Sequence, residues 1–202
     1  MDKEQADILW ADVELRRRKN NQILFRRDSL CLQPLLEAIG EQDHRTVAAW
    51  ALDCAWEPCR QLEERYEDSR PRQAIETCWA WARGQVKMRQ AQQAILAAHA
   101  MAKEVPSPAD AALCHAVGQA CGAVHVETHA IGLPMYELTA IVRRAAGQEW
   151  KREVREKIAW YLARLEEQRQ KTAEDPGPWA AFLLKARPNK EGLLAAARKR
   201  GN

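Results

Sequence analysis

The sequence of 202 residues contains no run of about eighteen apolar residues, the length that a membrane-spanning helix needs. Its first twenty residues are charged throughout and lack the apolar core of a secretory signal. Because both features are missing, we expect a protein that is made and kept in the cytoplasm and that no membrane helix anchors.

Strand signals are missing as well. β-Branched residues are few, no long stretch alternates apolar and polar residues, and no Asn-Gly pair marks a hairpin. The chain is rich instead in Ala, Glu, Gln, Lys and Arg, whose side chains lose little freedom in a helix. We therefore predict an all-α protein, a compact array of about eight to ten mostly antiparallel helices without a fixed repeat period.

Capping residues and prolines indicate where these helices begin and end. Asp43 and Ser107 are expected N-caps, and Gly40 and Gly84 are expected C-terminal stops. Pro58 must kink or restart the helix that begins at residue 43. The other helices are expected at about residues 4–19, 28–39, 70–83, 86–104, 107–129, 133–146 and 148–171, with short pieces near 178–186 and 190–199.

Motifs of catalytic chemistry are absent. The sequence has no phosphate-binding glycine loop, no nucleophile elbow and no pair of catalytic carboxylates. Asp43 and His44 are adjacent and could form an acid–base pair, but an N-cap is the expected use of Asp43. None of the six cysteines forms a Cys-x-x-Cys pair, so we expect buried thiols that act as small apolar side chains. We predict no catalytic residue and no cofactor.

The net charge is only +3, too small an excess to indicate a nucleic-acid-binding protein. The cations at residues 16–19, 26 and 27 and in the C-terminal segment alternate with acids, so nucleic acid is only an alternative partner. The charge is unevenly spread: residues 37–68 hold nine acidic and three basic residues, and residues 151–202 hold seven acidic and thirteen basic. The two segments can face each other within the fold, or either can face a partner.

Three of the five histidines fall in one stretch, HAVGQACGAVHVETHAIG at residues 115–132. If this stretch is one helix, a single face carries Ala111, His115, Gly118, Gly122, His125 and His129. Glycines four residues apart let a second helix approach closely. The pattern therefore favours a packing seam with hydrogen-bonded histidines.

A metal site is the alternative use of the same stretch. Histidines four residues apart can bind one metal ion, but a third ligand is needed, and His99 or Cys121 would have to supply it. Glu127 would point to the opposite side of such a helix, so the metalloprotease pattern is not met. The weaker, metal-binding interpretation rests on His99, His115, His125 and His129.

Four longer stretches form a further pattern. They are DHRTVAAWALDCA at 43–55, RPRQAIETCWAWARG at 70–84, QAILAAHAMAKEV at 93–105 and AVGQACGAVHVETHAIG from 116. Taken in this order, they resemble the immunity-five-like family of immunity proteins, which is associated with bacterial polymorphic toxin systems. The similarity covers about residues 40–165. In that family a histidine often follows the glycine at the position of Gly118, where this chain has Gln119.

The resemblance implies an all-helical cytoplasmic protein that binds and neutralises a cognate toxin and is not an enzyme. It divides the chain into an N-terminal helical extension at 1–40, an immunity-like core at 41–172 and a helical tail packed on that core at 173–202. A homodimer through the helix at 148–171 or the terminal helices stays open. The alternative functions are a histidine-based metalloprotein or enzyme and a weak nucleic-acid-binding protein.

An acidic stretch is the expected contact for such a toxin. Many toxin domains that act on nucleic acid are basic, and charge complementarity speeds association and selects the partner. The alternative is an ordinary solvated helix face. The residues of the stretch are Glu57, Glu63, Glu64, Glu67 and Asp68.

Overall fold

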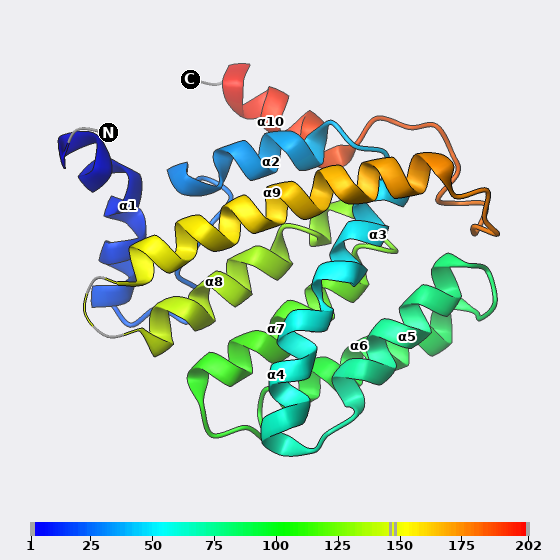
Figure 1. Cartoon of the computed structure of the whole chain (residues 1–202), viewed down its shortest axis with the longest axis horizontal. Coiled ribbons are helices and arrows are strands. Elements are labelled where there is room, and N and C mark those ends of the chain that lie inside the picture. Colours follow the sequence, from blue (N-terminus) through cyan, green and yellow to red (C-terminus); the bar gives the residue numbers. More distant parts are fainter. Residues whose placement is uncertain (1–2, 146, 148, 201–202) are drawn as a thin grey trace.

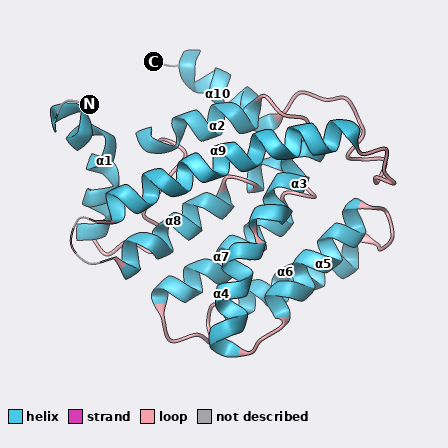
Figure 2. Cartoon of the chain, in the orientation of Figure 1, coloured by secondary structure: helices cyan, strands magenta, loops and turns pink. Residues whose placement is uncertain are grey.

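The computed structural model describes residues 3–145, 147 and 149–200, and over this part the chain is all-α, without a strand (Figures 1 and 2). The prediction of a compact all-α array is therefore confirmed. The described α-helices are α1 (Lys3–Arg18), α2 (Gln33–Gly40), α3 (His44–Cys54), α4 (Trp56–Tyr66), α5 (Arg70–Ala82), α6 (Met88–Met101), α7 (Pro108–Gly122), α8 (Gly132–Arg144), α9 (Trp150–Glu174) and α10 (Lys190–Arg200). Two 3₁₀ helices, η1 (Leu30–Leu32) and η2 (Glu127–His129), complete the description.

Local capping signals set several of these boundaries. The Asp43 carboxylate accepts a hydrogen bond from the backbone N–H of Thr46 at 2.7 Å and caps α3. The Ser107 hydroxyl accepts one from the N–H of Asp110 at 3.3 Å and caps α7. Gly84 follows α5 with a φ of +73°, the left-handed conformation in which many helices end. The predicted caps at all three positions are confirmed.

The break between α3 and α4 has a covalent cause. Proline has no backbone N–H and cannot donate to the carbonyl four residues earlier. Accordingly α3 ends at Cys54, and α4 begins at Trp56 with Pro58 in its first turn. The predicted restart is confirmed.

Helix α7 does not continue to residue 129, so the prediction of one long helix is wrong. It ends at Gly122, and the chain turns before the short helix η2. The turn brings the ring of His129 back onto Gly122, where a Cβ atom would lie 3.1 Å from His129 Cγ. The helix face that spacing alone predicted therefore loses His125 and His129.

The segment at 178–186 is also not a helix. It crosses α5 as a loop, and the N–H of Ala180 donates to the carbonyl of Ala82 at 2.8 Å. The Arg83 guanidinium carbon lies 4.0 Å from the ring centroid of Trp179. The segment is thus held at the end of α5 by one backbone hydrogen bond and one ring contact, and within it the N–H of Leu183 donates to the carbonyl of Ala180 at 2.9 Å. The short helix predicted near 190–199 is confirmed as α10.

Helix α7 lies at the centre of the array. It packs against α3, α4, α5, α6 and α8, and α9 packs along α3 and α8 (Figure 1). A helix surrounded in this way is apolar on every side, which explains why nearly all of its Ala, Cys and Val side chains are buried. None of the helices in the described part of the chain is both long and apolar enough to cross a membrane.

Buried charges join three of the helices. The Lys157 ammonium on α9 lies 2.9 Å from carboxylate oxygens of both Glu57 on α4 and Glu137 on α8. The Tyr161 hydroxyl donates a hydrogen bond to Glu137. Burial raises the pKa of Glu137, and the neighbouring ammonium opposes that rise. A carboxylate this deep needs such partners to stay in the interior.

The C-terminal helix packs on α2 through two glycines. A Cβ atom on Gly40 would lie 2.9 Å from the Cα of Gly192, and one on Gly192 would lie 2.6 Å from the carbonyl oxygen of Gly40. The side chain of Asn189 donates to the carbonyls of Ile39 and Gln42, both at 2.8 Å. Helix α2 ends at Gly40 as predicted, but the glycine is also the point where α10 touches it (Figure 1).

Candidate functional site

A pocket of about 380 Å³ opens between α5, α6, α7 and the turn that follows α7. We call it the α6 pocket. Its lining is mainly apolar, with histidines and glutamines, and contains neither Asp nor Glu. The lining residues are Trp81, Met88, Gln92, Ile95, Leu96, His99, Gly118, Gln119, Gly122, His125 and His129. Apolar pockets with a few polar groups are the usual form of a binding site.

Two of the histidines bind each other across α6 and α7. His99 Nδ1 lies 2.9 Å from His115 Nδ1, so one ring donates a proton that the other accepts. Burial lowers the pKa of both, and for His99 the neighbouring imidazoles add to the effect. His115 lines a second cavity of about 630 Å³ together with Tyr136, Lys103 and Arg143. The histidine pair therefore forms part of the wall between two cavities.

Glycine lets α7 approach α6 closely beneath this pair. A Cβ atom on Gly118 would lie 2.4 Å from Nε2 of His99, so the ring occupies the space of the missing side chain. The packing seam predicted from the glycines is confirmed at this position. It is formed by a histidine ring from α6 resting on the α7 backbone.

The remaining two histidines come from the turn after α7. The His125 ring stacks on Trp81, with ring centroids 6.2 Å apart and planes at 25°. His129 Nδ1 donates to the side-chain oxygen of Gln119 at 2.9 Å. Gln119 also fills the space over Gly132, where a Cβ atom would lie 2.6 Å from its Oε1. The structure thus brings three of the four candidate histidines, 99, 125 and 129, to the rim of one pocket.

The positions of these histidines also test the alternative interpretation, a metal site. Within the described residues no three His, Cys, Asp or Glu side chains are arranged to hold one. His99 and His115 engage each other through the Nδ1 atoms. Cys121, the other suggested ligand, is completely buried beside Cys78, and burial raises its pKa well above the usual range. What the histidines do supply is hydrogen bonds and ring contacts.

The family model described as "Imm-5 like putative immunity protein" matches residues 37–168, well over half of the chain. The chain belongs to this family. The resemblance seen in the sequence is therefore confirmed, and the match includes every residue that lines the α6 pocket. No curated protein and no solved structure matches the chain.

The acidic stretch of this immunity-family protein is largely paired within the chain. Glu63 meets Arg72 at 2.7 Å and Asp68 meets Arg70 at 2.6 Å, while Glu57 is held by Lys157 as described above. Of the five, Glu64 and Glu67 are exposed and the other three are half-buried. Asp53 pairs with Arg164, so the acidic segment and the basic end do face each other in part.

Glu127, which was expected on the opposite side of a helix from the histidines, is a buried carboxylate that binds the C-terminal segment. Glu127 is 0% exposed and accepts hydrogen bonds from Arg187 at 3.0 Å and from the N–H of Lys190 at 2.9 Å. Burial opposes its charge, but these backbone and arginine contacts keep its pKa below the usual value. His44 Nε2 donates to the Ala123 carbonyl at 2.8 Å, and its Nδ1 accepts from Arg187. Sequence reasoning missed this cluster because no spacing connects residue 127 with the tail.

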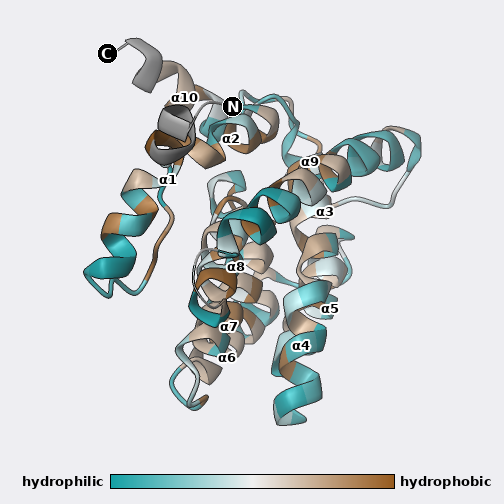
Figure 3. Cartoon of the chain, turned by 60° about the vertical axis from the view of Figure 1, so that its left-hand side comes forward, coloured by the Kyte–Doolittle hydropathy of each residue, from teal (hydrophilic) through white to brown (hydrophobic). Residues whose placement is uncertain are grey.

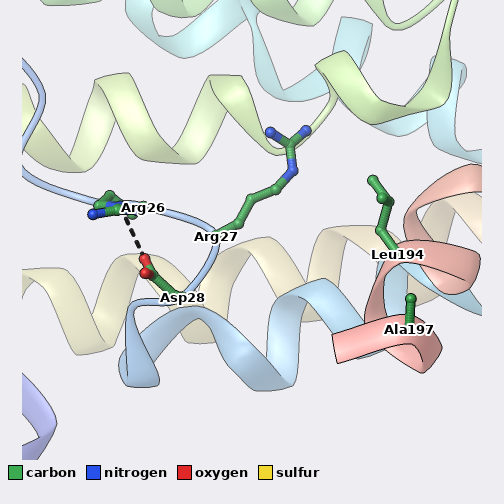
Figure 4. A pocket seen from close by; sticks show the side chains of 5 residues that line it. All are labelled: Arg26, Arg27, Asp28, Leu194 and Ala197. Carbon is green, nitrogen blue, oxygen red and sulfur yellow. Dashed lines mark ion pairs between the residues drawn. The ribbon is translucent and has the colours of Figure 1, made fainter. Parts of the chain in front are cut away.

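A third cavity, of about 520 Å³, lies between the loop at 26–28 and α10 (Figure 4). Arg26 pairs with Asp28 at 3.1 Å, and Arg27 binds Glu191 and the Thr128 carbonyl. Leu194 supplies the apolar side of the cavity from α10. Because its arginines already bind groups of the chain, this cavity is the seam along which the C-terminal helix meets the core.

Proposed function

We propose that this immunity-family protein binds and neutralises a cognate toxin of a bacterial polymorphic toxin system, without catalysing a reaction. The observation that carries the proposal is the family match over residues 37–168. Such a protein needs a recognition surface and no reacting group. The histidines support this function because each of the four candidates makes a ring contact or a hydrogen bond to a neighbouring side chain.

The α6 pocket has the features of a protein-docking surface. Met88 is 52% exposed and Leu96 is 59% exposed, side by side with the apolar lining of the pocket. Large apolar side chains left in solvent beside a pocket mark interaction sites. Trp81 lies within the pocket, and tryptophan is prominent among the residues that dominate binding energy. Coloured by hydropathy, α6 and α7 are more apolar than α4 (Figure 3).

The test is neutralisation by co-expression. A candidate toxin taken from a neighbouring gene should arrest growth when expressed alone, and the immunity-family protein should relieve the arrest. The two chains should also elute as one complex in size-exclusion chromatography. Relief of growth without a complex, or a complex without relief, would contradict neutralisation by binding.

The acidic stretch is a second proposed contact. Only its two exposed carboxylates, Glu64 and Glu67, are included, because the other three are paired within the chain. Replacing Glu64 and Glu67 with Gln should slow association with a basic toxin at low salt, because exposed charges act mainly on the association rate. Stopped-flow binding at two salt concentrations measures this. An unchanged rate would remove the acidic stretch from the interface.

A further inference from the structure

We propose that the α6 pocket receives an apolar side chain carried by an acidic segment of the partner protein. The proposal rests on the proposed function in taking that partner to be the toxin. It differs from the acidic-stretch contact in its location and in the charge of the segment that it recognises.

The shape and lining of the pocket define the apolar part of the ligand. Trp81 and Ile95 lie within it, and the exposed Met88 and Leu96 extend its apolar surface outward. A volume of about 380 Å³ accepts one large side chain such as Phe or Leu. Burying that side chain would also cover Met88 and Leu96, which the fold itself leaves in solvent.

The charge around the pocket defines the rest of the ligand. Residues 77–103 contain four cations and no acidic residue. Arg83 is bound to Asp175 at 2.6 Å, but Lys87 and Arg89, on either side of Met88, are exposed. Among the described residues no ion pair involves either of these two. A segment with carboxylates beside its apolar anchor would give them partners.

The pocket can also orient a carboxylate. Gln92 and His125 line it and carry N–H donors. Since the lining contains no Asp or Glu, an approaching carboxylate meets donors and cations without a repelling group. The site therefore selects an acidic segment over a basic one.

Two other occupants fit less well. A symmetric contact with a second copy of the chain would bring Lys87 and Arg89 against the same cations of the other copy. A nucleic acid would need a row of cations along its backbone, whereas the pocket lining contains no Lys or Arg, and the cations next to its Met88 are Lys87 and Arg89. Both occupants are outcomes of the experiment below.

The experiment measures binding of two labelled peptides to the full chain by fluorescence polarisation. One peptide has a single phenylalanine between glutamates, and the other has lysines in place of the glutamates. At low salt the acidic peptide should bind at least about tenfold more tightly, and the difference should shrink as salt screens the charges. Equal binding of the two peptides, or binding of neither, would overturn the proposal.

Variants locate the binding. Leu96→Asp should weaken the acidic peptide at least about tenfold, because it removes an apolar contact and adds a like charge. The matched control is Leu15→Asp on α1, where the leucine is 51% exposed and is not among the residues that line the α6 pocket. Joint replacement of Lys87 and Arg89 by Gln should reduce both affinity and its salt dependence. The control for this loss of charge is Arg152→Gln with Lys171→Gln on α9. Equal effects of test and control variants would overturn the proposal.

Two further measurements test the other possible occupants, nucleic acid and a second copy of the chain. An unstructured oligonucleotide that binds more tightly than the acidic peptide would replace the proposed ligand with nucleic acid. A dimer in light scattering that Leu96→Asp dissociates would assign the pocket to a second copy. Either result would overturn the proposal.

The growth assay separates this proposal from the proposed function. If the wild-type chain relieves toxicity and the Leu96→Asp chain does so equally well, the function stands and the pocket is not its contact. If the wild-type chain neither binds the toxin nor relieves toxicity, the proposed function fails. The peptide measurements then still decide whether the pocket selects acidic segments.

Discussion

The imidazole of His99 lies directly on Gly118, in the space that a side chain at position 118 would occupy. A Cβ atom there would be 2.4 Å from His99 Nε2 and 2.5 Å from Cε1. The ring cannot simply swing away, because its Nδ1 is held 2.9 Å from Nδ1 of His115. The close approach of α6 and α7 therefore requires glycine at this position.

Gly118→Ala should lower the free energy of unfolding by about 1–3 kcal/mol, the usual cost of overpacking a well-packed contact. Urea unfolding followed by tryptophan fluorescence measures the loss. The control is the same substitution in a His99→Ala background, where the obstructing ring is gone. The two substitutions should be strongly non-additive. A full loss in both backgrounds would show that something other than the ring limits position 118.

Gly192→Ala should release α10 from α2. The new methyl group would meet the carbonyl oxygen of Gly40 at 2.6 Å, and a backbone atom cannot give way as a side chain can. Hydrogen exchange in α10 should become faster, because local opening is governed by local stability, while exchange in α7 stays slow. Leu193→Ala, at an exposed position of the same helix, is the control and should change little. Unaltered exchange in α10 would contradict the glycine contact.

Stability should decline as the pH falls from 7.5 towards 5. Burial lowers the pKa values of His44, His99, His115 and His129 below their ordinary value of 6.5. Between that value and the lowered ones the unfolded chain binds more protons than the folded chain, so acid favours unfolding. The slope is up to about 1.4 kcal/mol per pH unit for each proton of difference, and it levels off below the folded-state pKa values.

Urea unfolding at several pH values measures this slope. The raised pKa of Glu137 acts in the opposite direction in the acid range, so the useful quantity is a difference between variants. Joint replacement of His99 and His115 by Gln should flatten the slope between pH 7.5 and 5, whereas Glu137 affects both proteins alike. Identical slopes would show that this histidine pair does not govern the acid response.

The thiols should be almost inert in the native protein. All six cysteines are free and buried, and burial raises the pKa values of Cys31, Cys59 and Cys114 to about 12. Because the thiolate is the reactive form, a disulfide reagent at pH 8 should label the folded chain slowly and all six sites at once in strong guanidinium. Rapid labelling of one site in the folded chain would reveal an opening near it.

Local signals decided a large part of the fold. Asp43, Ser107, Gly84 and Pro58 act on backbone groups within four residues, so their effects can be predicted from sequence alone. Composition likewise determined the helical class, because helix propensity is a property of single residues. Even the glycine at 118 indicated a close approach, since a missing side chain leaves room whatever fills it.

What fills that room depends on the tertiary structure. Helix α7 ends at Gly122, where the ring of His129 folds back on it, and the His99–His115 pair joins residues of two helices. The partners of Glu127 come from a tail sixty residues away. Spacing along a chain describes one helix at a time, whereas these contacts depend on how separate helices meet. The α6 pocket forms where α5, α6, α7 and the turn after α7 come together, so it could be identified only from the tertiary structure.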